Sequence, residues 1–181
     1  ELLVNTLQKE ISTLHENQVR LLTIGGIDHL PSVCQKNLIE AKEATKNNNG
    51  LTLLLALNYS GRWELVQAAK KMARDIKSGV ITLDDINENG FAGYLDTAGI
   101  PDPELLIRTS GEIRISNFLL WQIAYSELYI TPTLWPDFRK ENLYEAIWSY
   151  QQRERRFGRT SEQVTATSPV ASPPTGTRLD A

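Results

Sequence analysis

A chain of 181 residues with 41% hydrophobic and 23% charged side chains is long enough to bury a core and has an ordinary globular composition. This composition excludes a fibrous or wholly disordered protein, and the net charge of −3 gives no overall attraction to nucleic acid. The single cysteine, Cys34, excludes an internal disulfide framework, suits a reducing compartment and is expected to pack in or near the core. No apolar run approaches the ~18 residues of a membrane span, and no signal peptide is visible, so we expect a cytoplasmic location.

Hydrophobic periodicity predicts a regular alternation of helices and strands along the chain. Strands are expected over 19–24, 51–57, 105–107 and 128–130; helices are expected over 2–17, 31–47, 64–77, 83–95, 117 to about 127, and 140–155. The near-continuous apolar run 51–57 is typical of a strand covered on both faces. The expected fold class is therefore α/β, with a mainly parallel sheet flanked by helices.

Both ends of the chain carry expectations about its organisation. The first helix has an amphipathic stripe at Leu3, Leu7, Ile11 and Leu14 but no cap ahead of it, so we expect an N-terminal part to be missing and one sheet edge to be bare. Residues 160–181 lack periodicity and are rich in Ser, Thr and Pro, which predicts a disordered tail after one domain over 1–159.

Two arginines dominate the stretch from 101 to 138. Arg108 follows a short apolar strand, and Arg114 lies six residues further on, beyond a turn. Ser116 is placed to cap a helix beginning at Asn117, so guanidiniums, a hydroxyl and free backbone N–H groups would meet. Guanidinium forks pair bidentately with phosphate oxygens, which makes this a candidate diphosphate site. The alternative is that both arginines are surface charges paired with nearby glutamates.

The same stretch closely resembles the signature of the cis-prenyltransferases, the undecaprenyl diphosphate synthase (isoprenyl transferase) family. The matching segments are IRTSGE from 107, RISNFLLWQIAY from 114, ELY from 127 and LWPDF from 134. The resemblance implies an enzyme that adds isopentenyl diphosphate units to an allylic diphosphate, typically farnesyl diphosphate, with Z geometry. It further implies Mg²⁺, a homodimer or related heterodimer, a hydrophobic tunnel walled in part by 51–57, and a lipid product that brings peripheral membrane contact.

Carried over by position, the resemblance implies roles for six residues. The expected ligands of isopentenyl diphosphate are Arg108, Arg114, Ser116 and, through its backbone, Ile115. The expected Mg²⁺ ligand is Glu127, and Arg156, in a C-terminal Arg-x-Gly element, is a candidate contact of a partner subunit's substrate phosphate. Arg62, in the segment NYSGRW, is a candidate phosphate contact because it follows the strand 51–57 at the start of a helix; the resemblance puts this segment on the active-site side without assigning a contact. These residues have ordinary interpretations as well. Glu127 would be a helix-end carboxylate, Ser116 a helix cap only, and Arg62 and Arg156 solvated arginines.

The family's opening motif, Asp-Gly-Asn-Gly-Arg-Trp, and its Ser-Thr-Glu-Asn-Trp element do not occur in this sequence. Those segments carry an aspartate and an asparagine of the catalytic apparatus, so no catalytic residue is assigned within the chain. Charge must be neutralised at both ends of the developing bond, so we expect the chain alone to be inactive. The alternative is a non-catalytic subunit that supports an active partner. A nucleic-acid binder is disfavoured because the chain lacks a basic and aromatic platform.

Overall fold

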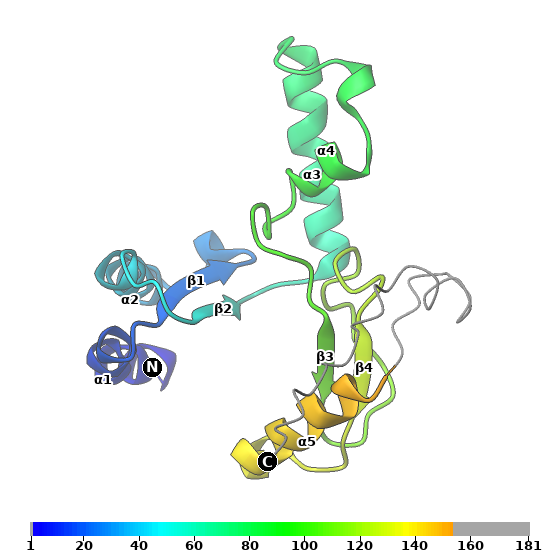
Figure 1. Cartoon of the computed structure of the whole chain (residues 1–181). Coiled ribbons are helices and arrows are strands. Elements are labelled where there is room, and N and C mark those ends of the chain that lie inside the picture. The colour runs from blue at the N-terminus through cyan, green and yellow to red at the C-terminus, as the bar shows by residue number, and fades with distance from the viewer. Residues whose placement is uncertain (1, 154–181) are drawn as a thin grey trace, which may run out of the picture. The chain divides into compact units, whose positions relative to one another are not determined.

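The computed structural model describes residues 2–153, and the side chains from Thr6 onward except those of residues 7 and 8. The predicted tail, 160–181, and Arg156 lie outside the described residues. The described chain divides into two compact units, which are considered separately (Figure 1). Unit 1 comprises residues up to Glu104 together with Ile113–Ser126, and unit 2 comprises Leu105–Glu112 and the chain from Glu127 onward. The prediction of one domain over 1–159 stays a prediction.

Unit 1 begins with an α/β arrangement. Helix α1 (Leu2–Glu16), strand β1 (Arg20–Ile24), helix α2 (Ser32–Thr45) and strand β2 (Thr52–Ala56) follow one another, with a 3-10 turn at Ile27–His29. The strands are parallel, with Arg20 opposite Thr52 and Ile24 opposite Ala56. This confirms the predicted strands and their parallel direction.

Helices α1 and α2 pack together and against β1, which places the core of unit 1 there. Leu21, Leu38 and Ala41 are almost fully buried, and Ile11 and Leu14 pack against them. Thr45, itself buried, donates its hydroxyl proton to the Ala41 carbonyl and accepts the Leu21 N–H at 3.0 Å. Burial of these side chains, at roughly 25 cal/mol per Å² of apolar surface, is what holds the helices on the strand.

Strand β2 is more exposed than its apolar sequence predicts. Thr52, Leu53 and Ala56 are exposed, so the expectation of a strand covered on both faces is wrong for the described residues. The reason is that α1 and α2 pack chiefly on β1, the other strand of this two-stranded sheet.

Helix α3 (Gly61–Lys77) is the longest helix of unit 1, and α4 (Glu88–Ala92) lies beside it (Figure 1). The predicted continuous helix over 83–95 is wrong. The chain forms a 3-10 turn at Leu83–Asp85, and Asn87 then adopts an extended conformation, from which its side chain accepts the Gly90 N–H and caps α4. A capping residue inside an apolar pattern breaks the helix because it competes with the helical hydrogen bonds.

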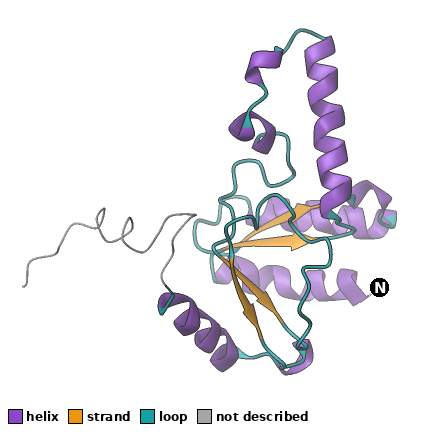
Figure 2. Ribbon diagram, turned by 90° about the vertical axis from the view of Figure 1, so that its right-hand side faces the viewer, coloured by secondary structure: helices purple, strands orange, loops and turns teal. Residues whose placement is uncertain are grey.

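Unit 2 contains the second parallel pair, β3 (Leu105–Arg108) and β4 (Glu127–Ile130), followed by a 3-10 turn at Trp135–Asp137 and helix α5 (Lys140–Gln151). The two pairs of strands are the orange arrows of Figure 2. Helix α5 packs on β4. Among the described residues, no helix is both long and apolar enough to cross a membrane.

Candidate functional site

The segment from Ile113 to Ser126, which carries Arg114, Ile115 and Ser116, is a succession of turns. The helix predicted from Asn117 is therefore wrong, and Ser116 caps no helix. Ser116, Asn117 and Leu119 all have positive φ, at 49°, 62° and 45°, which no continuous right-handed helix permits. Helical spacing of apolar residues gave the wrong prediction because their contacts with other parts of unit 1 outweigh local propensity.

This segment nevertheless meets a helix N-terminus, that of α3. The Asn117 carbonyl accepts the Gly61 N–H at 2.8 Å, and the Asn117 Oδ1 accepts the Arg62 N–H at 2.9 Å. The Asn117 amide also donates to the Ser60 hydroxyl, whose own side chain makes no capping bond to α3. Asn117 thus acts as a remote cap for α3 and satisfies two of its first N–H groups.

Close packing accompanies these bonds. A Cβ atom added to Gly61 would lie 2.8 Å from the Leu120 Cγ and 3.0 Å from the Asn117 carbonyl oxygen, so the two backbones approach at a distance that only glycine permits. Arg62 and Arg114 are exposed, and they come from the two segments joined in this way, the first turn of α3 and the loop 113–126. Of the predicted site residues, the structure therefore places Arg62, Arg114, Ile115 and Ser116 in one region of unit 1.

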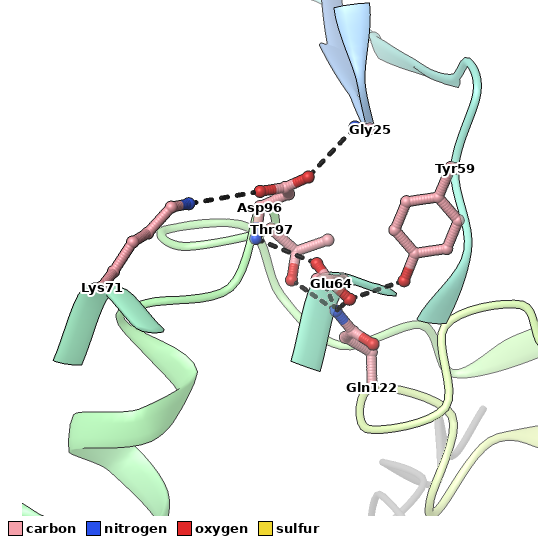
Figure 3. A network of polar contacts seen from close by, with 7 residues as sticks. All are labelled: Gly25, Tyr59, Glu64, Lys71, Asp96, Thr97 and Gln122. Carbon is pink, nitrogen blue, oxygen red and sulfur yellow. Dashed lines mark hydrogen bonds and ion pairs between the residues drawn. The ribbon is translucent and has the colours of Figure 1, made fainter. Parts of the chain in front are cut away.

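Beneath these loops lies a buried polar network centred on Glu64, which is 1% exposed (Figure 3). Its carboxylate accepts the Tyr59 hydroxyl at 2.6 Å, the Asp96 N–H at 2.9 Å and the Gln122 amide at 3.1 Å. Gln122 also donates to the Thr97 hydroxyl at 2.9 Å. Burial, followed by the hydrogen bond to Glu64 and the neighbouring carboxylates, raises the pKa of Tyr59 well above its usual range.

The network extends to the end of β1. Asp96 accepts the Gly25 N–H at 3.1 Å and pairs with Lys71 at 3.6 Å (Figure 3). Gly25 has a φ of 102°, and an added Cβ would lie 2.2 Å from the Leu57 carbonyl oxygen. One carboxylate cluster therefore ties together the end of β1, α3 and the 113–126 segment.

In unit 2, Arg108 ends β3, as the sequence predicts. Its carbonyl accepts the Thr131 N–H at 2.9 Å, and its Nε is buried without a hydrogen-bond partner among the described residues. Two N–H groups of the following turn are engaged, since that of Ser110 donates to the Thr133 carbonyl and that of Gly111 to the Thr131 carbonyl. The guanidinium of Arg108, rather than this backbone, is therefore the group with donor capacity left for an anion.

Glu127 begins β4 and lies opposite Leu105, at the end of the strand pair away from Arg108. Its Oε2 accepts a hydrogen bond from the Arg153 Nη1 at 2.8 Å. In the described part of the chain, no three His, Cys, Asp or Glu side chains lie close enough to hold a metal ion. Mg²⁺ commonly binds one or two carboxylates plus substrate phosphates, so Glu127, with its second oxygen, still fits one ligand of such a site.

The sequence missed three residues that organise unit 1: Asn117, Glu64 and Gln122. Asn117 was assigned to the start of a helix and Glu64 to an ordinary helix first turn. The one visible signal was a charged and an amide side chain, Glu64 and Gln122, at positions where helical periodicity predicts burial. Glu64 and Gln122 lie 58 positions apart in the chain, so no local pattern reveals the hydrogen bond between them.

The fold and these loops define an α/β protein whose arginine-bearing loops follow parallel strands, an arrangement suited to phosphorylated ligands. The sequence model of the putative undecaprenyl diphosphate synthase family matches residues 1–158. The chain is 52% identical over 164 residues to the isoprenyl transferase of Chlorobaculum tepidum, covering 91% of this chain and 62% of that relative. It is 46% identical over 166 residues to the (2E,6E)-farnesyl-diphosphate-specific ditrans,polycis-undecaprenyl-diphosphate synthase of Vibrio vulnificus, covering 92% and 66%.

Solved structures agree with these sequence relationships. Lavandulyl diphosphate synthase from Lavandula x intermedia, in complex with dimethylallyl diphosphate, matches with a TM-score of 0.83 and 37% identity over 86% of this chain and 68% of that one. A probable undecaprenyl diphosphate synthase from Campylobacter jejuni matches with a TM-score of 0.76 and 33% identity over 87% and 72%. The chain belongs to the undecaprenyl diphosphate synthase family of prenyltransferases, which confirms the predicted family and fold class. It spans 62% of the length of the Chlorobaculum relative.

Proposed function

We propose that this protein is a prenyltransferase that condenses isopentenyl diphosphate with an allylic diphosphate, such as farnesyl diphosphate, to give a long-chain Z-polyprenyl diphosphate. Membership of the family supports the reaction class. The observation that carries the proposal within the structure is Arg108, at the carboxyl end of a parallel strand, whose buried Nε has no hydrogen-bond partner in the described part of the chain. A buried donor without an acceptor costs about 1–3 kcal/mol, and a bound diphosphate would remove that cost.

The proposed contacts of isopentenyl diphosphate are Arg108, Arg114, Ser116 and the backbone of Ile115. Two guanidiniums supply planar donor forks and positive charge, and a serine hydroxyl supplies one further donor. Arg62 is a proposed additional phosphate contact, because its exposed side chain starts the helix to which the loop of Arg114 is joined.

Glu127 is the proposed protein ligand of Mg²⁺, with diphosphate oxygens and water completing the coordination. The ion would neutralise negative charge on the diphosphates. The homodimer and peripheral contact with a membrane through the lipid product are further proposals, and they rest on the family alone. The cytoplasmic location is also a proposal, and it rests on the single cysteine, which suits a reducing compartment.

We propose further that these 181 residues are inactive alone, because the two motifs named above are absent from them. The alternative, a non-catalytic partner subunit, is distinguished by reading the coding sequence upstream of Glu1. An Asp-Gly-Asn-Gly-Arg motif there favours the enzyme, and its absence favours the partner.

Isothermal titration of the 181-residue chain with isopentenyl diphosphate tests the substrate assignment directly, because binding does not require turnover. Arg108→Gln is expected to weaken binding by about 10- to 100-fold, since a charged hydrogen bond contributes about 1.5–3 kcal/mol. Arg20→Gln, which removes an exposed arginine from β1, is the matched control and should leave the affinity unchanged. Incorporation of labelled isopentenyl diphosphate into product would be measured in parallel for the 181-residue chain, with the Chlorobaculum tepidum isoprenyl transferase as positive control. No binding by the chain, with an active control enzyme, would refute the proposal.

A further inference from the structure

Asn117 occupies an unusual position among the described residues of unit 1. It joins its own loop, which carries Arg114, to the start of α3, which carries Arg62, through three hydrogen bonds: to the N–H groups of Gly61 and Arg62 and to the Ser60 hydroxyl. Its φ of 62° lies in the left-handed region, which asparagine tolerates better than most residues. Both its backbone and its side chain are therefore suited to this contact.

The bond to Arg62 has a direct consequence for the arginine side chain. The Oδ1 of Asn117 holds the backbone of Arg62, so it fixes the point from which that side chain leaves α3. The guanidinium of Arg62 is exposed and makes no hydrogen bond or ion pair with the described residues. Its backbone is thus fixed while its charged end stays available.

We propose that Asn117 is a positioning residue for the substrate diphosphate: it holds Arg62, in the first turn of α3, beside the loop of Arg114 and Ser116, so that the helix start and the loop bind one diphosphate together. This inference rests on the proposed function and adds to it the residue that joins the two segments. Asn117 itself touches no substrate in this scheme and acts through Arg62. An arginine whose backbone is held in place loses less conformational freedom on binding than one on a loose loop, and preorganisation of this kind raises affinity.

The experiment is a double-mutant cycle on the 181-residue chain, titrated with isopentenyl diphosphate. Asn117→Gly removes the side-chain bonds while keeping a residue that adopts positive φ freely. It is expected to weaken binding about tenfold, as is Arg62→Gln, and the double variant should bind no more weakly than either one. The matched control is Asn87→Gly, which removes the cap of α4 in the same unit and should leave the affinity unchanged.

A spectroscopic readout separates positioning from a general loss of stability. In the unmodified chain the Arg62 Nε–Hε resonance, assigned by its disappearance in Arg62→Gln, should shift when isopentenyl diphosphate is added. In Asn117→Gly the shift should be lost or strongly reduced at equal saturation. The cap variant Asn87→Gly should keep it.

Additive effects in the double variant, or an Asn117→Gly chain that binds as tightly as the unmodified one, would overturn the inference. If Asn117→Gly does not fold, Arg62→Gln still tests the inference, because the Arg62 side chain is exposed and its replacement should leave the fold intact. An unchanged affinity of Arg62→Gln would show that Arg62 binds no diphosphate and would overturn the inference. If the unmodified chain binds no isopentenyl diphosphate, the proposed function fails and the inference falls with it.

Discussion

Replacing Glu64 by leucine is the most informative perturbation of unit 1. The substitution removes a buried carboxylate but leaves its three donors in place: the Tyr59 hydroxyl, the Asp96 N–H and the Gln122 amide. Gln122 keeps its bond to Thr97, whereas the other two donors lose their acceptor. Each unsatisfied buried donor costs about 1–3 kcal/mol, and Tyr59 is only half-buried, so we expect Glu64→Leu to lower the free energy of unfolding by about 2–4 kcal/mol.

Urea unfolding followed by far-UV circular dichroism measures this loss. Glu64→Gln should fall between Glu64→Leu and the unmodified chain, because the amide keeps one acceptor oxygen but presents N–H groups to the remaining donors. The matched control is Glu40→Leu on α2, where the carboxylate is exposed and lies 3.9 Å from Lys36. Surface changes of that kind are usually within about 0.5 kcal/mol.

Amide hydrogen exchange adds a local readout, since the Asp96 N–H should lose protection in Glu64→Leu. An unfolding midpoint for Glu64→Leu within error of the unmodified chain, with Asp96 still protected, would refute the reasoning. That result would mean that water or other groups satisfy the donors, and that the carboxylate does not hold the network together.

Three further predictions follow from the same structure. Gly25→Ala should lower the free energy of unfolding by more than about 3 kcal/mol, because the new Cβ would lie 2.2 Å from the Leu57 carbonyl oxygen. The control is Gly79→Ala, which is also at positive φ but has open space around it. It should lower the free energy of unfolding by only about 1–2 kcal/mol in the same urea assay. Because its pKa is raised, Tyr59 keeps in the folded chain a proton that the unfolded chain loses above about pH 10. The free energy of unfolding should therefore fall as the pH rises past that value, and Tyr59→Phe should flatten this alkaline loss. An equally steep loss in Tyr59→Phe would contradict the raised pKa of Tyr59. Arg153→Gln removes the ion-pair partner of Glu127, the proposed Mg²⁺ ligand. In a titration with isopentenyl diphosphate present, this variant should bind Mg²⁺ up to about fivefold more tightly. Weaker Mg²⁺ binding would mean that Arg153 supports the metal site and does not compete with the ion for Glu127.

The α/β class, the four strands and their parallel direction were predictable from the sequence because they rest on local patterns. A short apolar run between turn residues forms a strand almost regardless of its neighbours, as at Arg20–Ile24 and Leu105–Arg108. The family was predictable because its signature is contiguous in the chain, from Ile107 onward. The prediction that Arg108 ends a strand held for the same reason.

Tertiary structure alone decided the shape of the segment that carries Arg114 and Ser116. Its apolar spacing predicts a helix from Asn117, yet three residues there take left-handed conformations, with φ values between 45° and 62°. Those conformations cost energy locally and persist because bonds to Gly61, Arg62 and Glu64 outweigh the cost.

The sequence by itself therefore determined the four strands and the family, whereas the helices predicted over 83–95 and from Asn117 were wrong. The residues proposed to bind a diphosphate also come from the sequence. Only the folded chain decided that Asn117 caps α3 and that Glu64 accepts hydrogen bonds from Asp96 and Gln122, since these contacts join residues 32 to 58 positions apart. Local patterns extend over one or two turns of a helix, whereas hydrogen bonds between distant residues depend on how the whole unit packs.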